Sequence, residues 1–294
     1  MSQASDMIRK GFAEGDDARD AGLTTPEDIE RYDNILYGED PAWQLLDVYR
    51  PKDAEGRKLP VIFSIHGGGW VYGDKNRYQF YCMNLAQRGF AVVNFTYRLA
   101  PEFQFPASLE DTNLVVTWIL ENAEQYGFDT DHIFAVGDSA GGHNLGLYAA
   151  ICTNPDYAKD FPFTVPEGFV PTAIGLNCGV YSFRDASTVD ELTMTLMKDL
   201  LPGGATPEEL EHISSVNYVT ENFPPTFYMT CTGDFLKPQA PLLSKALLAK
   251  DVPQEFHYFG SSEETLGHVF HLNIRSERAA QFNDLECRFF QGFL

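Results

Sequence analysis

The stretch FAVGDSAGGHNLGLYAA, residues 134–150, passes from an apolar, strand-like segment directly into a helix-forming one, with a serine at the junction. Within it, Gly137-Asp138-Ser139-Ala140-Gly141 fits the pattern G-x-S-x-G, in which glycines two residues to either side of the serine permit a very tight turn. Such a turn holds the serine hydroxyl exposed, where a base can reach it. Because short glycine-serine patterns also arise by chance, the meaning of this one depends on partners elsewhere in the chain.

Around this turn, short apolar runs alternate with longer helical patterns. The alternation predicts an α/β fold in which a mainly parallel sheet lies between helices. The strands are expected at 59–67, 90–98, 132–139, 172–180, 226–234 and 254–260, and the helices at 76–89, 108–127 and 238–252.

Two acidic, helix-like stretches do not fit the alternation, residues 1–40 and 181–222. We interpret them as additions above the carboxyl edge of the sheet, where α/β folds place their binding crevices. Plain surface helices are an equally good interpretation of the same residues. The 294 residues are expected to share one core.

The formal net charge is −21, from 21 basic and 42 acidic residues. Such a surface repels nucleic acid and anionic membranes, so neither is an expected partner, and a small neutral substrate is favoured. The polar N-terminus and the lack of a long apolar run predict a soluble, cytoplasmic protein. The five cysteines are scattered and lack C-x-x-C spacing, which predicts reduced core thiols and gives no support to a zinc site.

A second glycine-rich element, HGGGW at 66–70, directly follows an apolar strand. Three consecutive glycines pack nothing, so their N–H groups are expected to face a ligand, and an oxyanion is the natural one. The Ala140 N–H, at the start of a helix, would add a donor. A phosphate-binding loop is the rival use, but neither of its usual glycine patterns is present.

A base for the serine should be a histidine that follows the acid in the chain. His268 lies in a loop after the last expected strand and before the final helix, and His271 is the fallback. Of the others after the serine, His143 is expected to point away from it, His212 lies in the 181–222 stretch, and His257 is expected to be a satisfied core residue. His268 and His271 lack a nearby third ligand for a metal.

The acid is expected at Asp234, where the strand 226–234 ends in Gly-Asp. Its task would be to accept the imidazole N–H and fix the tautomer of the base. A role as helix N-cap is the alternative, but the position between Ser139 and His268 favours the acid. Asp251 comes too late in the chain.

In combination these motifs resemble the hormone-sensitive-lipase-like esterases, which are α/β hydrolases, over about residues 40–290. The fold implied is a mostly parallel eight-stranded sheet flanked by helices, with a helical cap. The motifs are HGGGW (66–70), YRLAPE (97–102), GDSAGG (137–142), PPTF leading to GD (224–234) and GHVF (267–270).

The resemblance implies an N-terminal cap segment (1–40), a catalytic domain (41–180 and 223–294) and a cap insertion (181–222). It implies that Glu110 and Asp111 are structural and that His66 orients the oxyanion loop. Three departures from the family pattern are His143 before Asn144, Val269 after His268, and Phe103 where the family usually has a histidine. The implied site has Ser139 as nucleophile, Asp234 as acid and His268 as base, with an oxyanion hole of Gly67, Gly68, Gly69 and Ala140, whose donors are Gly68, Gly69 and Ala140.

The activity implied is hydrolysis of short-chain carboxylic esters, acetyl to butyryl, through an acyl-enzyme and without metal or organic cofactor. The same residues would serve a deacetylase or an amide or formamide hydrolase. A ligand-binding protein on a hydrolase fold, like the gibberellin receptors, is the third alternative. Dimers are frequent among related esterases, which leaves a homodimer open.

Overall fold

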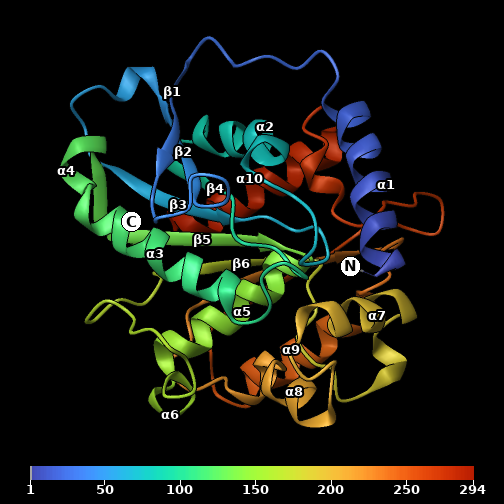
Figure 1. Ribbon diagram of the computed structural model, residues 1–294. Coiled ribbons are helices and arrows are strands. Elements are labelled where there is room, and N and C mark those ends of the chain that lie inside the picture. The colour runs from blue at the N-terminus through green and yellow to red at the C-terminus, as the bar shows by residue number, and fades with distance from the viewer. Residues whose placement is uncertain (1) are drawn as a thin grey trace.

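The structure is a computed structural model that describes residues 2–294. Its centre is one eight-stranded sheet in the order β1-β2-β4-β3-β5-β6-β7-β8, in which β2 alone runs against its neighbours. The predicted mostly parallel α/β architecture is therefore confirmed (Figure 1). The strands are β1 (Ile29–Leu36), β2 (Leu45–Pro51), β3 (Leu59–Ile65), β4 (Ala91–Phe95), β5 (Phe128–Asp138), β6 (Ile174–Asn177), β7 (Thr226–Cys231) and β8 (Gln254–Phe259).

Helices cover both faces of the sheet, with α2 and α10 on one side and α3 and α5 on the other (Figure 1). Alternate residues of β3 follow this division, since Phe63 packs toward α3 and α5 while Ile62 packs with α2 and α10. The helices are α1 (Gln3–Asp20), α2 (Lys75–Ala86), α3 (Ala107–Glu121), α4 (Ala123–Tyr126), α5 (Ala140–Thr153), α6 (Pro155–Ala158), α7 (Glu191–Leu200), α8 (Pro207–His212), α9 (Ala240–Leu248) and α10 (Glu277–Gln291).

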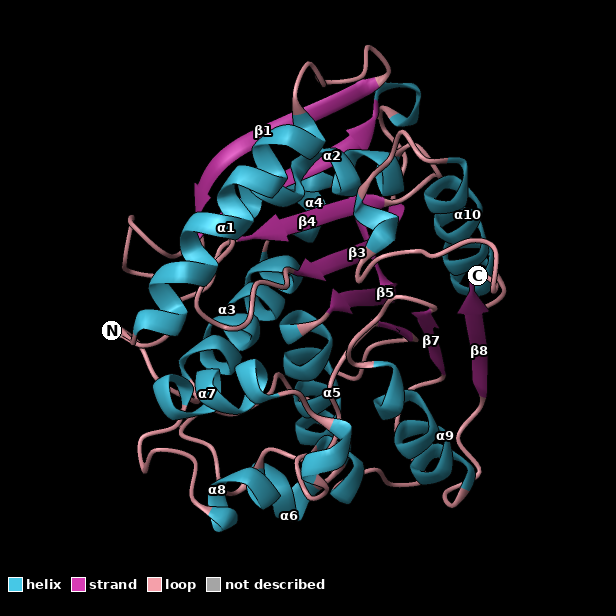
Figure 2. Ribbon diagram, turned by 90° about the vertical axis from the view of Figure 1, so that its right-hand side faces the viewer, coloured by secondary structure: helices cyan, strands magenta, loops and turns pink. Residues whose placement is uncertain are grey.

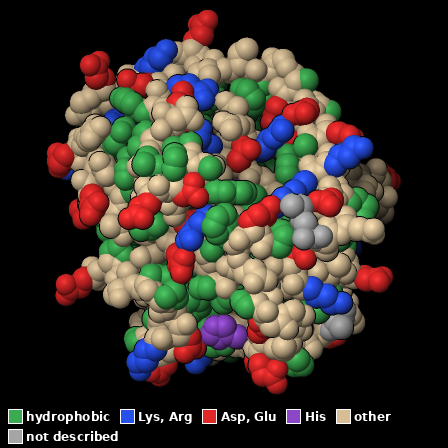
Figure 3. Space-filling model, viewed as in Figure 1, with side chains coloured by type: hydrophobic (Ala, Val, Ile, Leu, Met, Phe, Trp, Pro, Cys, Tyr) green, Lys and Arg blue, Asp and Glu red, His purple; other side chains and the backbone are tan. Residues whose placement is uncertain are grey.

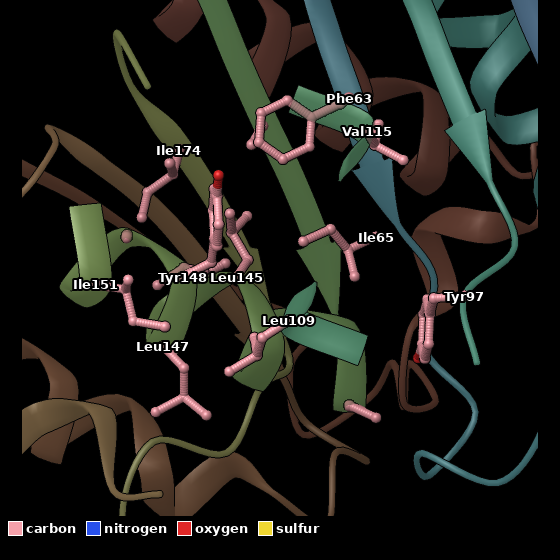
Figure 4. Close-up of a cluster of buried hydrophobic side chains, with 14 of the residues drawn as sticks. Phe63, Ile65, Tyr97, Leu109, Val115, Leu145, Leu147, Tyr148, Ile151 and Ile174 are labelled. Atoms are coloured by element: carbon pink, nitrogen blue, oxygen red, sulfur yellow. The ribbon is translucent and has the colours of Figure 1, made fainter. Parts of the chain in front are cut away.

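Helix α5 is almost completely buried, which explains why the sequence after the serine is apolar on every side. Its side chains Leu145 and Tyr148 lie beside Phe63 and Ile65 of β3 (Figure 4). The helix that begins at Ala140 is thus fixed against the centre of the sheet, and so is the turn before it.

The expectation that residues 1–40 are helix-like is wrong for their second part. Gln3–Asp20 forms α1, but Ile29–Leu36 forms the edge strand β1, paired antiparallel with β2. Most of its side chains are half-buried or exposed, and a register shift between Tyr32 and Ile35 interrupts the pairing. The alternation of apolar and polar residues that is typical of a half-buried strand is therefore weak in this segment.

Helices α1 and α7 lie against each other at the carboxyl edge of the sheet (Figure 2). The Ser2 hydroxyl, at the start of α1, donates to Asp199 of α7 at 2.5 Å. The two stretches that did not fit the alternation therefore meet above the edge where the serine turn lies. Their description as a cap, with boundaries at 1–40 and 181–222, remains a proposal.

Acidic side chains are spread over the face shown in Figure 3, interspersed with basic ones and with apolar patches. Within residues 2–294, no helix combines the length and the apolar character needed to cross a bilayer.

Glu286 of α10 is a fully buried carboxyl beneath the sheet. It accepts hydrogen bonds from the Asn177 amide at 2.7 Å and from the Tyr81 hydroxyl at 3.3 Å. Burial outweighs these bonds and raises the pKa of Glu286 from 4.5 to about 7. Because the folded state holds this proton more tightly than the unfolded state, its contribution to stability is fully present below pH 4.5 and is lost as the pH rises through about 7.

We expect Glu286→Gln to gain stability over the wild type as the pH rises from 4.5 to 8, by up to about 3 kcal/mol. Urea unfolding at several pH values would measure this difference. Glu121→Gln, at an exposed position on α3, is the matched control and should follow the wild type at every pH. Parallel curves for Glu286→Gln and the wild type would contradict the prediction.

Candidate active site

The turn after β5 holds Ser139 in a strained conformation, with φ 52° and ψ −118°. A side chain on Gly137 would place its Cβ 2.5 Å from the Gly141 carbonyl oxygen, and one on Gly141 would come 2.0 Å from the Ile65 carbonyl oxygen. Both glycines of the G-x-S-x-G pattern are therefore required by close packing. The turn is anchored to the next strand because the Ser139 N–H donates to the Asn177 carbonyl at 2.9 Å.

The three residues expected to act together come together in the structure. His268 Nε2 lies 2.9 Å from Ser139 Oγ, and His268 Nδ1 lies 2.7 Å from Asp234 Oδ1. Asp234 is buried, whereas His268 remains partly accessible. This hydrogen-bonded chain is the arrangement in which an imidazole can take the serine proton while a carboxylate fixes its tautomer.

A bridge between two glycines places the acid beside the base. Gly233 and Gly267 form an isolated parallel bridge, and the Gly233 N–H donates to the Leu266 carbonyl at 2.8 Å. A Cβ on Gly233 would lie 2.7 Å from that same carbonyl oxygen, so the approach requires glycine. The residues that follow, Asp234 and His268, are thereby brought into contact.

The Asp234 carboxylate accepts two hydrogen bonds besides the one from His268. The Thr230 hydroxyl donates to Oδ2 at 2.6 Å and the Leu236 N–H donates to Oδ1 at 2.9 Å. Burial acts to raise the pKa of Asp234, but the contacts with His268, Thr230 and Leu236 outweigh it and hold the pKa below its usual value. The group is therefore ionised at neutral pH, as support for an imidazolium requires.

The glycine loop at 66–70 approaches the serine turn. Gly68 and Gly69 have φ values of 112° and 61°, and a Cβ on Gly68 would lie 2.1 Å from the Tyr72 carbonyl oxygen. Among residues 2–294, no acceptor is found for the N–H groups of Gly68, Gly69 and Ala140. The Gly67 N–H, by contrast, donates to the Tyr78 hydroxyl at 2.8 Å and is not available to an oxyanion. Of the four residues expected in the oxyanion hole, Gly67 is thus a neighbour and not a donor.

His66 supports this loop from behind. Its Nδ1 lies 2.7 Å from the Gly67 carbonyl, and its ring stacks on Tyr97 at 4.1 Å. Burial lowers the pKa of His66 to about 4, so the ring is neutral and Nδ1–H donates to the carbonyl. A Cβ on Gly73 would meet this ring at 2.5 Å. The contacts agree with a role in orienting the loop.

His143 connects the loop to the 181–222 stretch. Its Nε2–H donates to the Ile213 carbonyl at 2.8 Å, and its Nδ1 accepts from the Trp70 indole at 3.1 Å. Burial lowers the pKa of His143 to about 4, which keeps it neutral, as both bonds require. Trp70 lines the cavity at the serine, so His143 shapes that wall through Trp70.

The remaining acidic and histidine candidates do not contact the serine. Arg98 binds both Glu110, at 2.7 Å, and Asp111, at 3.0 Å, which is the structural role expected for the pair. His271 is fully buried, and within residues 2–294 neither of its ring nitrogens has a hydrogen-bond partner. His257 lies on the edge strand β8, partly exposed and bonded to Glu255 at 2.7 Å. The expectation that His257 is a core residue is therefore wrong.

Cys178 joins Asp234 and His268 in a group whose ligand atoms lie within 4.8 Å of one another, a spacing that a metal ion could bridge. Both imidazole nitrogens are already engaged, one by Asp234 and the other by Ser139. The donor set therefore fits proton transfer better than metal binding.

Tyr78 and Asp138 form a contact that sequence reasoning did not find. The Tyr78 hydroxyl accepts from the Gly67 N–H and donates to Asp138 Oδ2, both at 2.8 Å. Burial raises the pKa of Asp138 to about 7, while the bond from Tyr78 acts to lower it. One hydroxyl on α2 thus ties the glycine loop to the residue before the serine.

We expect Tyr78→Phe to lower the kcat of any reaction at Ser139 by about 10- to 100-fold, because the glycine loop beside the serine loses its anchor. The unpartnered Gly67 N–H and Asp138 carboxyl should also cost about 1–3 kcal/mol of stability. Steady-state kinetics with thermal unfolding would measure both effects. Tyr81→Phe, one turn further along α2 and outside the cavity wall, is the control, and an equal loss of kcat in both variants would contradict the assignment.

The serine opens into a cavity of about 360 Å³. Helix α1 and helix α7 form its outer wall, and the glycine loop and the segments after Asp234 and His268 form the rest. Its lining is mostly apolar, with the Asp16–Arg19 ion pair at 2.8 Å as a polar feature of the α1 wall. A neutral, largely apolar molecule of small size fits such a cavity.

A family model described as BD-FAE matches residues 46–247. A relative, the versiconal hemiacetal acetate esterase of Dothistroma septosporum, is 31% identical over 72% of this chain and 68% of its own. The chain belongs to the family of hormone-sensitive-lipase-like carboxylesterases and has the α/β-hydrolase fold. This family member also resembles a crystal structure of C6-C4 SN3 inhibited esterase B from Lactobacillus rhamnosis. The TM-score is 0.89 and the sequence identity is 27%, and the match covers 99% of this chain and 97% of the other.

Esterase LipC of Mycobacterium tuberculosis is 31% identical over 69% of this chain. The chain spans about half the length of this mycobacterial relative, since the match covers 51% of it. The residues matched by the family model, 46–247, include the glycine loop at 66–70 and the serine turn at 137–141.

Proposed function

We propose that this family member is a serine carboxylesterase that hydrolyses short-chain esters, acetyl to butyryl, through an acyl-enzyme. The observation that carries the proposal is the hydrogen-bonded chain from Ser139 through His268 to Asp234, at the wall of a cavity of about 360 Å³ beside the Gly68 and Gly69 N–H groups.

The geometry supports a two-step reaction. Ser139 Oγ attacks the ester carbon while His268 Nε2 takes its proton, and the carbonyl oxygen gains negative charge beside the N–H groups of Gly68, Gly69 and Ala140. His268 then gives that proton to the alcohol oxygen as the carbon–oxygen bond breaks. Water repeats the cycle on the acyl-enzyme, with its proton passing through His268, and the acid is released. Asp234 stabilises the imidazolium at both steps.

The short acyl chain is supported by the size of the cavity, which is near the lower end for ligand sites. It is also supported by the names of two relatives, the acetate esterase of Dothistroma and an ethyl acetate hydrolase of Pseudomonas putida, 38% identical over 32% of this chain. The net charge of −21 favours neutral esters over anionic ones.

Amide hydrolysis is the second candidate. An arylacetamide deacetylase of Bos taurus is 40% identical over 51% of this chain, and the same three residues would serve that reaction. A homodimer and a cytoplasmic location remain predictions, which ultracentrifugation and cell fractionation would test.

The test is hydrolysis of p-nitrophenyl acetate, butyrate, octanoate and palmitate by the wild-type protein. The expected result is fast turnover of acetate and butyrate and little of octanoate and palmitate. A neutral alkyl phosphonate should block turnover and label Ser139, as mass spectrometry of the digest would show. A folded protein that turns over none of the four esters would overturn the proposal and favour the amide-hydrolase or ligand-binding alternative.

A further inference from the structure

Phe235 directly follows the acid Asp234 and covers one face of the base. Its ring centroid lies 4.3 Å from that of His268, with an interplanar angle of 43°. The side chain lines the catalytic cavity and yet is 49% exposed. A large apolar ring therefore stands between solvent and the imidazole, at a place where core packing does not require it.

Two further exposed apolar side chains line the same cavity from other elements. Phe12 of α1 is 43% exposed and Leu192 of α7 is 40% exposed. Phe12 is held in place by an edge contact with Tyr72, whose ring centroid is 5.9 Å away. Single exposed apolar side chains are ordinary, but three from separate elements around one cavity form a surface that a ligand can cover.

The position beside His268 decides which part of an ester can lie there. His268 Nε2, 2.9 Å from Ser139 Oγ, must pass its proton to the alcohol oxygen as the carbon–oxygen bond breaks, so the leaving alcohol has to lie on the histidine side of the serine. Phe235 covers that histidine, so a group attached to the alcohol oxygen comes within its reach.

On the basis of the proposed esterase function, we propose that Phe12, Leu192 and Phe235 form the subsite for the alcohol portion of the substrate, and that this alcohol is uncharged and carries an aromatic or bulky apolar group. The three side chains offer only apolar surface and two ring faces. Binding of such a group would bury them, whereas a small alkyl alcohol would leave them in water.

The test compares benzyl acetate with ethyl acetate, which share the acyl group and release primary alcohols. The wild type should have the higher kcat/KM for benzyl acetate. Phe235→Ala should lower the benzyl-to-ethyl ratio of kcat/KM by about fivefold, the size expected for an aromatic contact. The ratio of ethyl butyrate to ethyl acetate should not change in this variant, because only the acyl group differs between those two substrates.

Phe256→Ala is the matched control, since Phe256 on β8 is 46% exposed and lies outside the cavity wall. Both of its ratios should equal those of the wild type. Phe12→Ala should lower the benzyl-to-ethyl ratio in the same direction, which keeps the test valid if Phe235→Ala does not fold.

The outcomes separate this inference from the proposed function. A benzyl-to-ethyl ratio that is unchanged in Phe235→Ala and Phe12→Ala would overturn the alcohol subsite while leaving the esterase activity standing. An equal loss on every ester would show that Phe235 supports His268 and does not select the alcohol, which also overturns the inference. A wild type that hydrolyses none of the esters would instead overturn the proposed function.

Discussion

Ser139→Ala is expected to lower kcat for acetate esters by about 10⁵- to 10⁶-fold, while the protein stays folded. The mutation removes the oxygen that attacks the ester carbon, and no water can occupy the same place with the same activation by His268. The residual rate would come from the oxyanion donors and from binding alone. Release of p-nitrophenol at high enzyme concentration would measure it.

The Ser139→Ala protein also loses the site of covalent labelling by a phosphonate. Because alanine is smaller than serine and introduces no new contact, the thermal unfolding of the variant should stay close to that of the wild type. Ser187→Ala, at an exposed position between α6 and α7 and outside the cavity wall, is the control and should keep full activity. Activity retained in Ser139→Ala would show that another group in the chain performs the chemistry.

Strands β3 to β7 could be predicted from sequence because they are buried on both faces. These five strands consist largely of buried residues, so each contains a short apolar run, which in β5 covers only residues 133–136. β6 is shorter than its apolar run, because Cys178 adopts a φ of 50° and ends it. The inner strand β2 is also largely buried but is missing from the expected strands, because Asp47 and Arg50 interrupt its apolar residues. Edge strand β1 has neither a continuous apolar run nor clean alternation, and pairing with β2 is what makes it a strand.

Ser139, Asp234 and His268 could be located from sequence because Ser139 and Asp234 follow the buried strands β5 and β7, and His268 lies in the loop between the last strand and the final helix. The residues that support these three could not be predicted from the sequence. Tyr78 is one aromatic residue within a helix, and its bond to Gly67 exists only once α2 packs beside the glycine loop. Thr230 lies on a buried strand, where only its spacing of four residues from Asp234 offers a signal. In the sequence Phe235 is not distinguishable from an ordinary loop residue, and only the structure shows that its ring lies beside His268.

Asp234→Asn is expected to lower kcat by about 10⁴-fold with the overall geometry intact. Asp234 Oδ1 accepts the Nδ1–H of His268 at 2.7 Å, which leaves Nε2 with a lone pair toward Ser139. An asparagine can present its amide N–H to Nδ1 instead, which favours the tautomer that carries its proton on Nε2 and cannot take one from the serine. It also removes the negative charge that stabilises the imidazolium.

Asp251→Asn is the matched control for this prediction, because Asp251 is the other aspartate considered from sequence. Asp251 is exposed in the turn after α9 and has a φ of 54°, a conformation that asparagine also adopts readily. Its kcat/KM for p-nitrophenyl acetate should stay within about twofold of the wild type, since surface substitutions away from a site have small effects. If Asp251→Asn lost activity and Asp234→Asn kept it, the bond between Asp234 and His268 would have no part in catalysis. If only Asp234→Asn lost activity, and its unfolding curve matched that of the wild type, Asp234 would be shown to take part in the reaction through His268.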